Sequence, residues 1–224
     1  MFAIIAASGN GTRFGEKKQF LKIAGKYILR LIAQKLISCQ VENIVIATQL
    51  EDLAKCKKIL KGLEKHICFS QGGVTRQETV KKAFLKFYEN YDKTDIVLIH
   101  DAARPFFDIN LTKTLIKTAK ETKAAILAQP INDTVKKTNS LLVKTTLNRN
   151  QLFLAQTPQA FEINLFKQAI LNNEKNEKFC TDDSQLVENL KFDVKIIPSF
   201  KTNFKITTKE DLKFAEFLIL NEKY

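Results

Sequence analysis

Apolar residues recur along the chain in two alternating patterns. Short continuous apolar runs predict strands covered on both faces, as in a parallel sheet, while apolar residues three and four positions apart predict helices with one buried face. The runs predict strands at residues 2–7, 43–48, 67–70, 95–99, 124–129, 152–155 and 192–197. The helical spacing predicts helices at residues 27–39, 51–65, 80–91, 111–123 and 163–171, with one more at the C-terminus.

This alternation of strands and helices is typical of βαβ units around a mostly parallel sheet, so we expect an α/β fold. No linker or internal repeat divides the chain, and residues 1–224 are expected to form one domain. Residues 132–149 depart from the pattern, because a polar segment, a turn at 138–140 and an apolar segment predict a β-hairpin. We interpret this insertion as a β-arm that serves dimerisation.

The first predicted strand ends at a glycine-rich loop that carries positive charge. Gly9 and Gly11 let the backbone approach a ligand closely, so that successive N–H groups can converge on phosphate oxygens. Arg13 and Lys18 follow in the sequence. The loop matches neither the P-loop nor the dinucleotide fingerprint. It predicts a phosphate-binding loop of another kind, and the alternative is an ordinary turn with solvated cations.

A second polar loop, residues 72–79, follows the strand at 67–70. Two glycines there can admit the edge of a ligand, while Arg76 offers a fork of donors and Thr79 offers a hydroxyl. An ordinary helix start that needs a cap explains the same residues equally well.

The strand at 95–99 ends in an acid and an arginine, Asp101 and Arg104, which are hard to explain by packing. We expect Asp101 to contact a ribose or a hydrated Mg²⁺, and Arg104 to bind a phosphate. A structural salt bridge between the two is the alternative. His100 is interpreted as neutral and hydrogen-bonded, since no serine or cysteine nucleophile is paired with it.

Three later segments carry polar side chains. Residues 156–159 are rich in neutral donors and acceptors, which suit a polyol or a phosphate. The acids of residues 181–184 are explained by capping of a helix start. Thr207 and Glu210 predict a capping box for the C-terminal helix, and Lys205 just before it is positioned to face a site.

Composition narrows the functional classes. The net charge of +12 fits an anionic ligand, but most lysines lie in helix-like segments and the aromatic residues occupy core positions, so nucleic-acid binding is disfavoured. The dispersed cysteines indicate reduced thiols rather than a metal site. Without a long apolar run or a signal peptide, the chain is expected to be soluble, cytoplasmic and independent of membranes.

A series of segments then resembles one family in order along the whole chain: AASGNGTRFG, KKQFL, GGVTRQETV, HDAARPF, NDTVKKT, NRNQLFLAQTPQAF, TDDSQLVE and NFKITTKEDL. The family is the 2-C-methyl-D-erythritol 4-phosphate cytidylyltransferases of the non-mevalonate isoprenoid pathway. The resemblance implies a Rossmann-like nucleotidyltransferase fold, with a twisted sheet flanked by helices and a protruding β-arm. It also implies a homodimer that joins CTP to methylerythritol phosphate and releases pyrophosphate.

The resemblance also assigns roles to residues. It implies that the catalytic cations are Arg13, Lys18, Arg149 and Lys205. It implies that CTP is bound by Ala7, Ser8, Gly9, Gly11, Gly73, Thr79 and Asp101, with Gly73 and Thr79 at the cytosine. It implies a polyol-phosphate pocket of Asp101, Arg104, Thr134, Arg149, Thr157, Thr181 and Lys205, with Thr134 and Arg149 coming from the partner subunit. Mg²⁺ is expected mainly on the phosphates of CTP, with no assigned protein ligand.

Four positions depart from the family pattern. Ser8 stands where the family usually has alanine, Ala6 where proline often precedes the loop, and Lys17 where proline is common before Lys18. Val74 stands where an aspartate often helps to read the cytosine, so base recognition is expected to rely on backbone groups and Thr79.

Two other functions are compatible with the sequence. A ribitol-5-phosphate cytidylyltransferase is the closest, although the segment HDAARP favours methylerythritol phosphate because the ribitol enzymes tend to have Asp-Ser-Val-Arg there. A nucleotide-binding or nucleic-acid-binding module without catalysis is the alternative of a different class.

Overall fold

The computed structural model describes residues 1–11, 14–176 and 179–221. Its main element is a seven-stranded sheet in the order β11-β7-β10-β6-β1-β4-β5. The strands are β1 (Phe2–Ala6), β4 (Asn43–Thr48), β5 (Ile67–Gln71), β6 (Ile96–Asp101), β7 (Ala124–Pro130), β10 (Phe153–Glu162) and β11 (Lys195–Pro198). All neighbours are parallel except β10, which is antiparallel to both β6 and β7. The predicted α/β fold with a mostly parallel sheet is therefore confirmed.

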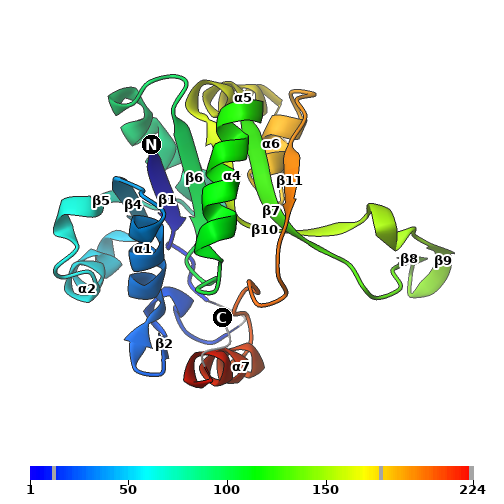
Figure 1. Ribbon diagram of the computed structural model, residues 1–224, viewed down its shortest axis with the longest axis horizontal. Helices are drawn as coiled ribbons and strands as arrows, with labels where there is room; N and C mark the ends of the chain where they lie inside the picture. The colour runs from blue at the N-terminus through cyan, green and yellow to red at the C-terminus, as the bar shows by residue number, and fades with distance from the viewer. Residues whose placement is uncertain (12–13, 177–178, 222–224) are drawn as a thin grey trace.

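Helices cover both faces of this sheet (Figure 1). The α-helices are α1 (Ile28–Ser38), α2 (Leu53–Ile59), α3 (Arg76–Phe87), α4 (Ile109–Thr122), α5 (Ile163–Asn176), α6 (Ser184–Glu188) and α7 (Lys209–Leu220). The short 3-10 helices are η1 (Lys18–Phe20), η2 (Leu50–Asp52), η3 (Glu64–His66), η4 (Tyr88–Asn90) and η5 (Arg149–Gln151). A small antiparallel pair, β2 (Lys22–Ile23) and β3 (Lys26–Tyr27), precedes α1.

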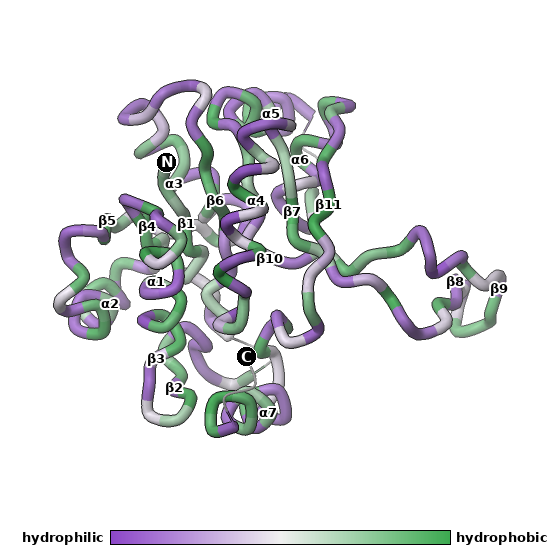
Figure 2. The backbone as a smooth tube through the Cα atoms, viewed as in Figure 1, coloured by the Kyte–Doolittle hydropathy of each residue, from purple (hydrophilic) through white to green (hydrophobic). Residues whose placement is uncertain are grey.

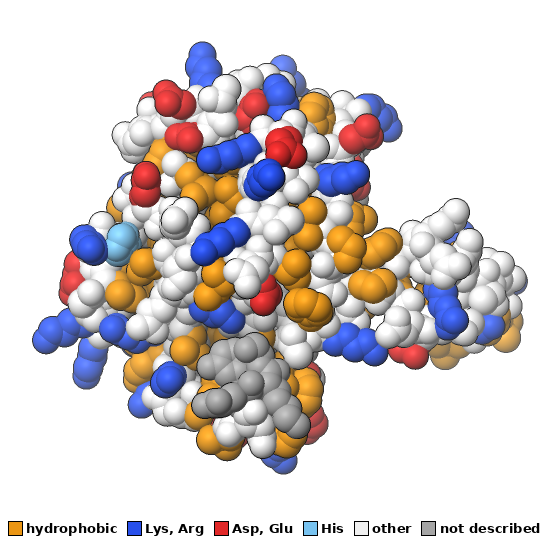
Figure 3. Space-filling view, viewed as in Figure 1, with side chains coloured by type: hydrophobic (Ala, Val, Ile, Leu, Met, Phe, Trp, Pro, Cys, Tyr) orange, Lys and Arg blue, Asp and Glu red, His pale blue; other side chains and the backbone are white. Residues whose placement is uncertain are grey.

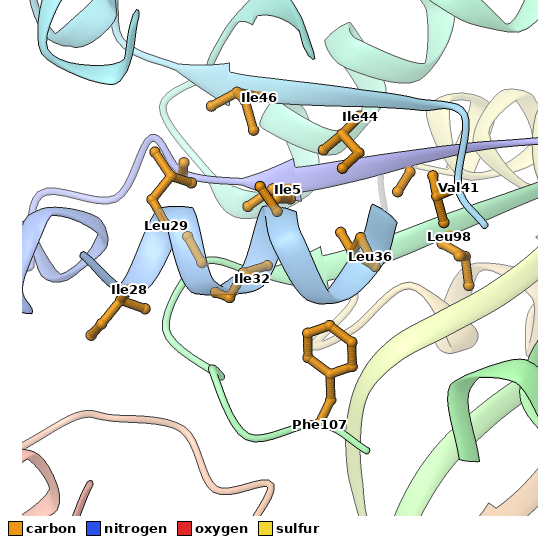
Figure 4. Close-up of a cluster of buried hydrophobic side chains, with 14 of the residues drawn as sticks. Ile5, Ile28, Leu29, Ile32, Leu36, Val41, Ile44, Ile46, Leu98 and Phe107 are labelled. Carbon is orange, nitrogen blue, oxygen red and sulfur yellow. The ribbon is translucent and has the colours of Figure 1, made fainter. Parts of the chain in front are cut away.

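The two faces of the sheet bury separate hydrophobic clusters. Ile5 of β1 packs in the cluster formed with α1, α4 and α7, whereas its neighbour Ile4 packs in the cluster formed with α3, α5 and α6. Figure 4 shows Ile5 facing Leu29 and Ile32 of α1. The apolar positions gather in the central strands (Figure 2). Because neighbouring side chains point to opposite faces, burial on both faces requires the continuous apolar run seen in the sequence.

Two element predictions were wrong. The helix expected at residues 51–65 is broken into η2, α2 and η3, because α2 ends at Ile59 and Gly62 adopts a positive φ of 87°. The C-terminal helix is capped by Thr208 and Asp211, one residue later than the pair expected.

The strand expected in the core at residues 152–155 is exposed there. Phe153 and Leu154 are 38% and 52% exposed. Residues 153–155 pair with β7 alone, whereas β10 continues to residue 162 and its residues 159–162 also pair with β6. Residues 156–161 are the buried part of the strand. The sequence pattern did not reveal this because residues 156–159 are polar.

A second hairpin, β8 (Lys136–Asn139) and β9 (Leu142–Thr146), forms a separate two-stranded sheet. Every residue from 136 to 151 is exposed, and Figure 1 shows the hairpin at the end of two long connecting segments. Its tip carries exposed apolar side chains at Leu141, Leu142 and Val143. The dimerisation role of the hairpin stays a prediction.

No helix in the described part of the chain is long and apolar enough to cross a membrane.

Candidate active site

The carboxyl ends of β1, β4 and β6 meet at one edge of the sheet. Ala6 is paired in register with Ala47 on one side and with Asp101 on the other, so the loops that leave these strands start side by side. They enclose a cleft of about 440 Å³. It is lined by Ala6, Ser8, Gly9, Asn10, Gly11, Lys18, Gln19, Gln49, Val74, Thr75, Arg76, Asp101, Ala102, Ala103 and Lys205.

The glycine-rich loop forms one wall of this cleft. Gly11 has a φ of 67°, and a Cβ atom there would overlap the carbonyl oxygen of Glu16, so only glycine fits. Gln19 fixes the start of the loop, since its Nε2 donates to the carbonyl of Ala7 at 2.8 Å. The predicted phosphate-loop residues Ser8, Gly9 and Gly11 are therefore all at the cleft, and Ala7 lies directly beneath it.

The loop before α3 packs directly on the glycine-rich loop. A Cβ atom on Gly72 would overlap the side chain of Ser8, so glycine permits this close approach. Ser8 Oγ lies 2.6 Å from Thr79 Oγ1. The Thr79 hydroxyl also accepts from the N–H of Gly73 at 3.0 Å and donates to the carbonyl of Thr75 at 2.8 Å.

These contacts place Thr79 beneath the cleft wall rather than on it. The side chain is completely buried, and its hydroxyl is saturated by protein partners. The N–H of Val74 is likewise used, since it donates to Glu78 Oε2 at 2.7 Å. The Thr79 hydroxyl and the N–H groups of Gly73 and Val74 are thus already engaged in contacts within and between the two loops.

Asp101, which also lines the cleft, is the centre of an ion cluster. Its Oδ1 accepts from Arg76 Nε and its Oδ2 from Lys205 Nζ, both at 2.7 Å. Arg76 also pairs with Asp183 at 2.7 Å. Burial raises the pKa of Asp101, but the ion pairs with Arg76 and Lys205 outweigh it and hold the pKa far below its ordinary value. Asp101 is therefore ionised near neutral pH.

Arg104 makes a longer contact with the same acid. Its Nε is 3.8 Å from Asp101, a longer separation than those of Arg76 and Lys205, so the simple Asp101–Arg104 pair is not the main interaction of the acid. Its Nη1 donates to the carbonyl of Asn203 at 2.8 Å. Asn203 in turn donates to the carbonyl of Thr157, and Thr157 Oγ1 accepts from the N–H of Asp101 at 3.1 Å. Arg104 and Thr157 thus fasten β6, β10 and the segment before α7 to one another.

His100 has the neutral role expected. Burial lowers its pKa to about 3, and its Nε2 forms a hydrogen bond with the carbonyl of Arg104 at 2.9 Å. Its ring also packs edge-on against Phe107. A histidine with this pKa carries no charge near neutral pH.

The adjacent lysines of the first loop have different surroundings. Lys17 pairs with Glu51 at 2.6 Å and with Asp52 at 2.7 Å, outside the cleft. Lys18 is one of the residues that line the cleft. The extra charge of Lys17 therefore ties the loop to η2 and is neutralised there.

Several predicted site residues lie elsewhere. Thr134 is exposed beside the β8–β9 hairpin, and Arg149 lines a separate cavity at its base, where Nη1 donates to the carbonyl of Asn132 at 2.6 Å. Thr181 is exposed and its N–H donates to Gln185 Oε1. Arg13 lies outside the described residues.

Sequence reasoning missed Asp183 and did not assign Arg76 to the site. Both acids of residues 182–183 were attributed to capping, but only Asp182 caps, by accepting from the N–H of Gln185 at 3.1 Å. Asp183 is 1% exposed and pairs with Arg76. The sequence did carry a sign of this second role, because one helix start needs only one capping acid and two adjacent acids are present. Among the described residues, no group of three or more His, Cys, Asp or Glu side chains is arranged to hold a metal ion.

Comparisons with known proteins agree on one family. A family model described as 2-C-methyl-D-erythritol 4-phosphate cytidylyltransferase matches residues 1–221. A protein of that name from Clostridioides difficile is 40% identical, over 98% of this chain and 94% of its own length. One from Petrotoga mobilis is 34% identical, over 96% of each chain. The crystal structure of the Thermus thermophilus protein of that name superimposes with a TM-score of 0.80, at 28% identity over 97% of each chain.

The ion cluster predicts a pH-dependent stability defect. Arg76→Met leaves Asp101 and Asp183 without their shared partner, and we expect a loss of about 3 kcal/mol in the free energy of unfolding at pH 7. Burial already raises the pKa of Asp183 and Arg76 opposes that rise, so the pKa climbs further in the variant. An acid with a raised folded-state pKa binds protons more tightly when folded, so the loss should be smaller at pH 5. Urea denaturation of both proteins at pH 7 and pH 5 measures this loss in the free energy of unfolding.

Lys82→Met is the matched control, because Lys82 pairs with Glu78 on the exposed face of the same helix. We expect its stability to stay close to that of the natural chain at both pH values. An Arg76→Met defect of equal size at pH 7 and pH 5 would contradict the account of Asp183.

Proposed function

The chain belongs to the 2-C-methyl-D-erythritol 4-phosphate cytidylyltransferase family, and we propose that its reaction takes place in the cleft beside Asp101. The protein is an enzyme that transfers the cytidylyl group of CTP to 2-C-methyl-D-erythritol 4-phosphate. The products are 4-diphosphocytidyl-2-C-methyl-D-erythritol and pyrophosphate. One observation supports this location. The cleft is lined by the glycine-rich loop, Lys18, Asp101 and Lys205, which are far apart in the sequence.

The chemistry needs position and charge rather than a protein nucleophile. A phosphate oxygen of methylerythritol phosphate forms a bond to the α-phosphorus of CTP, while the bond from that phosphorus to the pyrophosphate oxygen breaks in line. Negative charge grows on the five-coordinate phosphorus and on the leaving group. Fixed cations and N–H groups placed before the reaction stabilise this charge most effectively.

The glycine-rich loop is the proposed triphosphate site. Its backbone runs along the cleft wall from Ser8 to Gly11, where successive N–H groups can face phosphate oxygens. Lys18 also lines the cleft and is the proposed cation for the reacting phosphorus. Arg13 is proposed to act with it, on the basis of the family resemblance alone.

The Asp101 cluster is the proposed polyol-phosphate side. Asp101 is an ionised acceptor suited to sugar hydroxyls, and Lys205 beside it supplies charge for the substrate phosphate. Arg104 and Thr157 lie directly behind Asp101. We therefore assign them to holding this wall in place as well as to the pocket itself.

Mg²⁺ is proposed as the cofactor and would be held mainly by the phosphates of CTP. This arrangement fits the chemistry of Mg²⁺, which keeps several waters and commonly binds substrate phosphates in nucleotide sites. Asp101 is the carboxylate among the residues that line the cleft, but its two oxygens are paired with Arg76 and Lys205, so we assign no protein ligand to the ion. When bound, the ion supplies positive charge to the triphosphate.

Thr134 and Arg149 are proposed to act in the cleft of a partner subunit. Within one chain they lie beside the hairpin, away from the residues that line the cleft. The exposed apolar tip of the hairpin also suits burial against a second copy. The enzyme is proposed to work as a homodimer in the cytoplasm, where CTP is available.

Pyrophosphate release tests the assignment. The purified chain with Mg²⁺ and CTP should release pyrophosphate when 2-C-methyl-D-erythritol 4-phosphate is added. Ribitol 5-phosphate should support at most a small fraction of that rate. Release with ribitol 5-phosphate alone would establish the rival substrate, and release with neither would refute the proposed activity.

Lys18→Ala tests the proposed cation. The variant should lose about 100-fold or more in kcat while CTP affinity and thermal stability stay near those of the natural chain, because the lysine acts mainly on charge that grows in the transition state. Lys26→Ala, which removes an exposed lysine from the small β2–β3 pair, should keep the full rate. An unchanged kcat in Lys18→Ala would remove Lys18 from the mechanism.

Sedimentation tests the dimer. At micromolar concentration the protein should have about twice the 25.6 kDa mass of one chain. Leu142→Asp should shift the population toward one chain, since it places a charge in the apolar tip. Leu171→Asp, at an exposed position of α5, is the matched control and should remain dimeric. A natural chain that sediments as a monomer would exclude the arrangement.

A further inference from the structure

One stretch of the cleft wall has few groups left to recognise a nucleotide base. Val74 is 96% exposed there but has no polar side-chain atom. The N–H groups of Gly73 and Val74 are bound to Thr79 and Glu78, and the hydroxyls of Ser8 and Thr79 are bound to each other. The N–H groups and hydroxyls at this wall are therefore already used, and a base would be recognised there by acceptors.

Gln49 supplies one such acceptor. It follows β4 and lines the cleft between the two loops. Its Nε2 donates to the carbonyl of Gly73 at 3.2 Å and makes a weaker contact with the carbonyl of Ser8 at 3.5 Å. Because carbonyl oxygens only accept hydrogen bonds, these two neighbours fix which end of the amide faces them.

The opposite end of the amide is an acceptor. Both hydrogen bonds of the Gln49 side chain use Nε2. Within the described part of the chain, no residue donates a hydrogen bond to Gln49 Oε1. The orientation cannot be reversed without setting Oε1 against two carbonyl oxygens. The cleft therefore presents a fixed acceptor at this point.

A fixed acceptor distinguishes pyrimidines by the group at position 4 of the ring. Cytosine carries an amine there, which donates, whereas uracil carries a carbonyl oxygen, which only accepts. The phosphates are drawn to the N–H groups of the glycine-rich loop and to Lys18. Arg76, the cation nearest in sequence to Val74, is already paired with two carboxylates. The neutral wall formed by Gln49 and Val74 is left for the base.

We propose that Gln49 Oε1 accepts a hydrogen bond from the exocyclic amine of cytosine and so selects CTP over UTP. The inference rests on the proposed function, since it requires a pyrimidine nucleotide in the cleft. Gly73 and Ser8 have an indirect part, because their carbonyl oxygens hold the amide in the selective orientation.

Paired deletions on the enzyme and on the nucleotide test this contact. Gln49→Met removes the amide at similar length, and the triphosphate of pyrimidin-2-one riboside lacks the amine of CTP. In the natural chain, removal of the amine should lower kcat/KM about 10-fold, as expected for one neutral hydrogen bond. In Gln49→Met, kcat/KM for CTP should already be about 10-fold lower than in the natural chain. Removal of the amine from the nucleotide should then lower kcat/KM no further. The preference for CTP over UTP should fall in parallel.

Gln34→Met, an exposed glutamine on α1, is the control and should keep the nucleotide preference of the natural chain. Gln49→Leu provides a second deletion of the same amide, and thermal unfolding checks that each variant is folded. If removal of the amine lowers kcat/KM by the same factor in the natural chain and in both Gln49 variants, the proposal is wrong and Gln49 only supports the loops. If the natural chain does not turn over CTP with methylerythritol phosphate, the proposed function itself fails.

Discussion

The ion cluster at Asp101 joins parts of the chain that no continuous segment could hold together. Arg76 comes from the start of α3, Asp183 precedes α6, and Lys205 precedes α7. Each is tied directly or through Arg76 to the end of β6. A buried carboxylate is tolerated only with such partners, so the position of each segment depends on the others. The ion pairs consequently fix the relative positions of the segments that line the cleft.

The second constraint is the close packing of backbone at the sheet edge. Register places Ala6 beside Asp101, and glycine at position 72 lets the following loop rest on Ser8. Thr79 then fixes this contact with its buried hydroxyl. The two loops are thus held to each other mainly by hydrogen bonds, and the segments around Asp101 are held by ion pairs. The surface in Figure 3 carries lysine and arginine side chains over much of the visible face, so net charge alone does not locate the site.

The sequence predicted those features that depend on local pattern. The apolar runs located the starts of the sheet strands to within a few residues, because strands buried on both faces need continuous apolar runs. The exposure of Phe153 and Leu154 could not be predicted, since it depends on where β10 leaves its neighbours. The role of Asp183 was hidden because an acid at a helix start has an ordinary explanation, and its partner Arg76 is distant in sequence. Likewise, Thr79 could be matched to a site, but only the packing of two loops shows that its hydroxyl is buried.

Asp101 stays ionised because its ion pairs outweigh its burial. A ¹³C NMR titration of the aspartate carboxyl carbons, with Asp101 assigned through Asp101→Asn, measures this directly. The account predicts that the Asp101 signal does not move between pH 7 and about pH 3, a range in which unperturbed aspartates titrate around a pKa of about 3.9. A titration midpoint for Asp101 at or above that ordinary value would contradict the account.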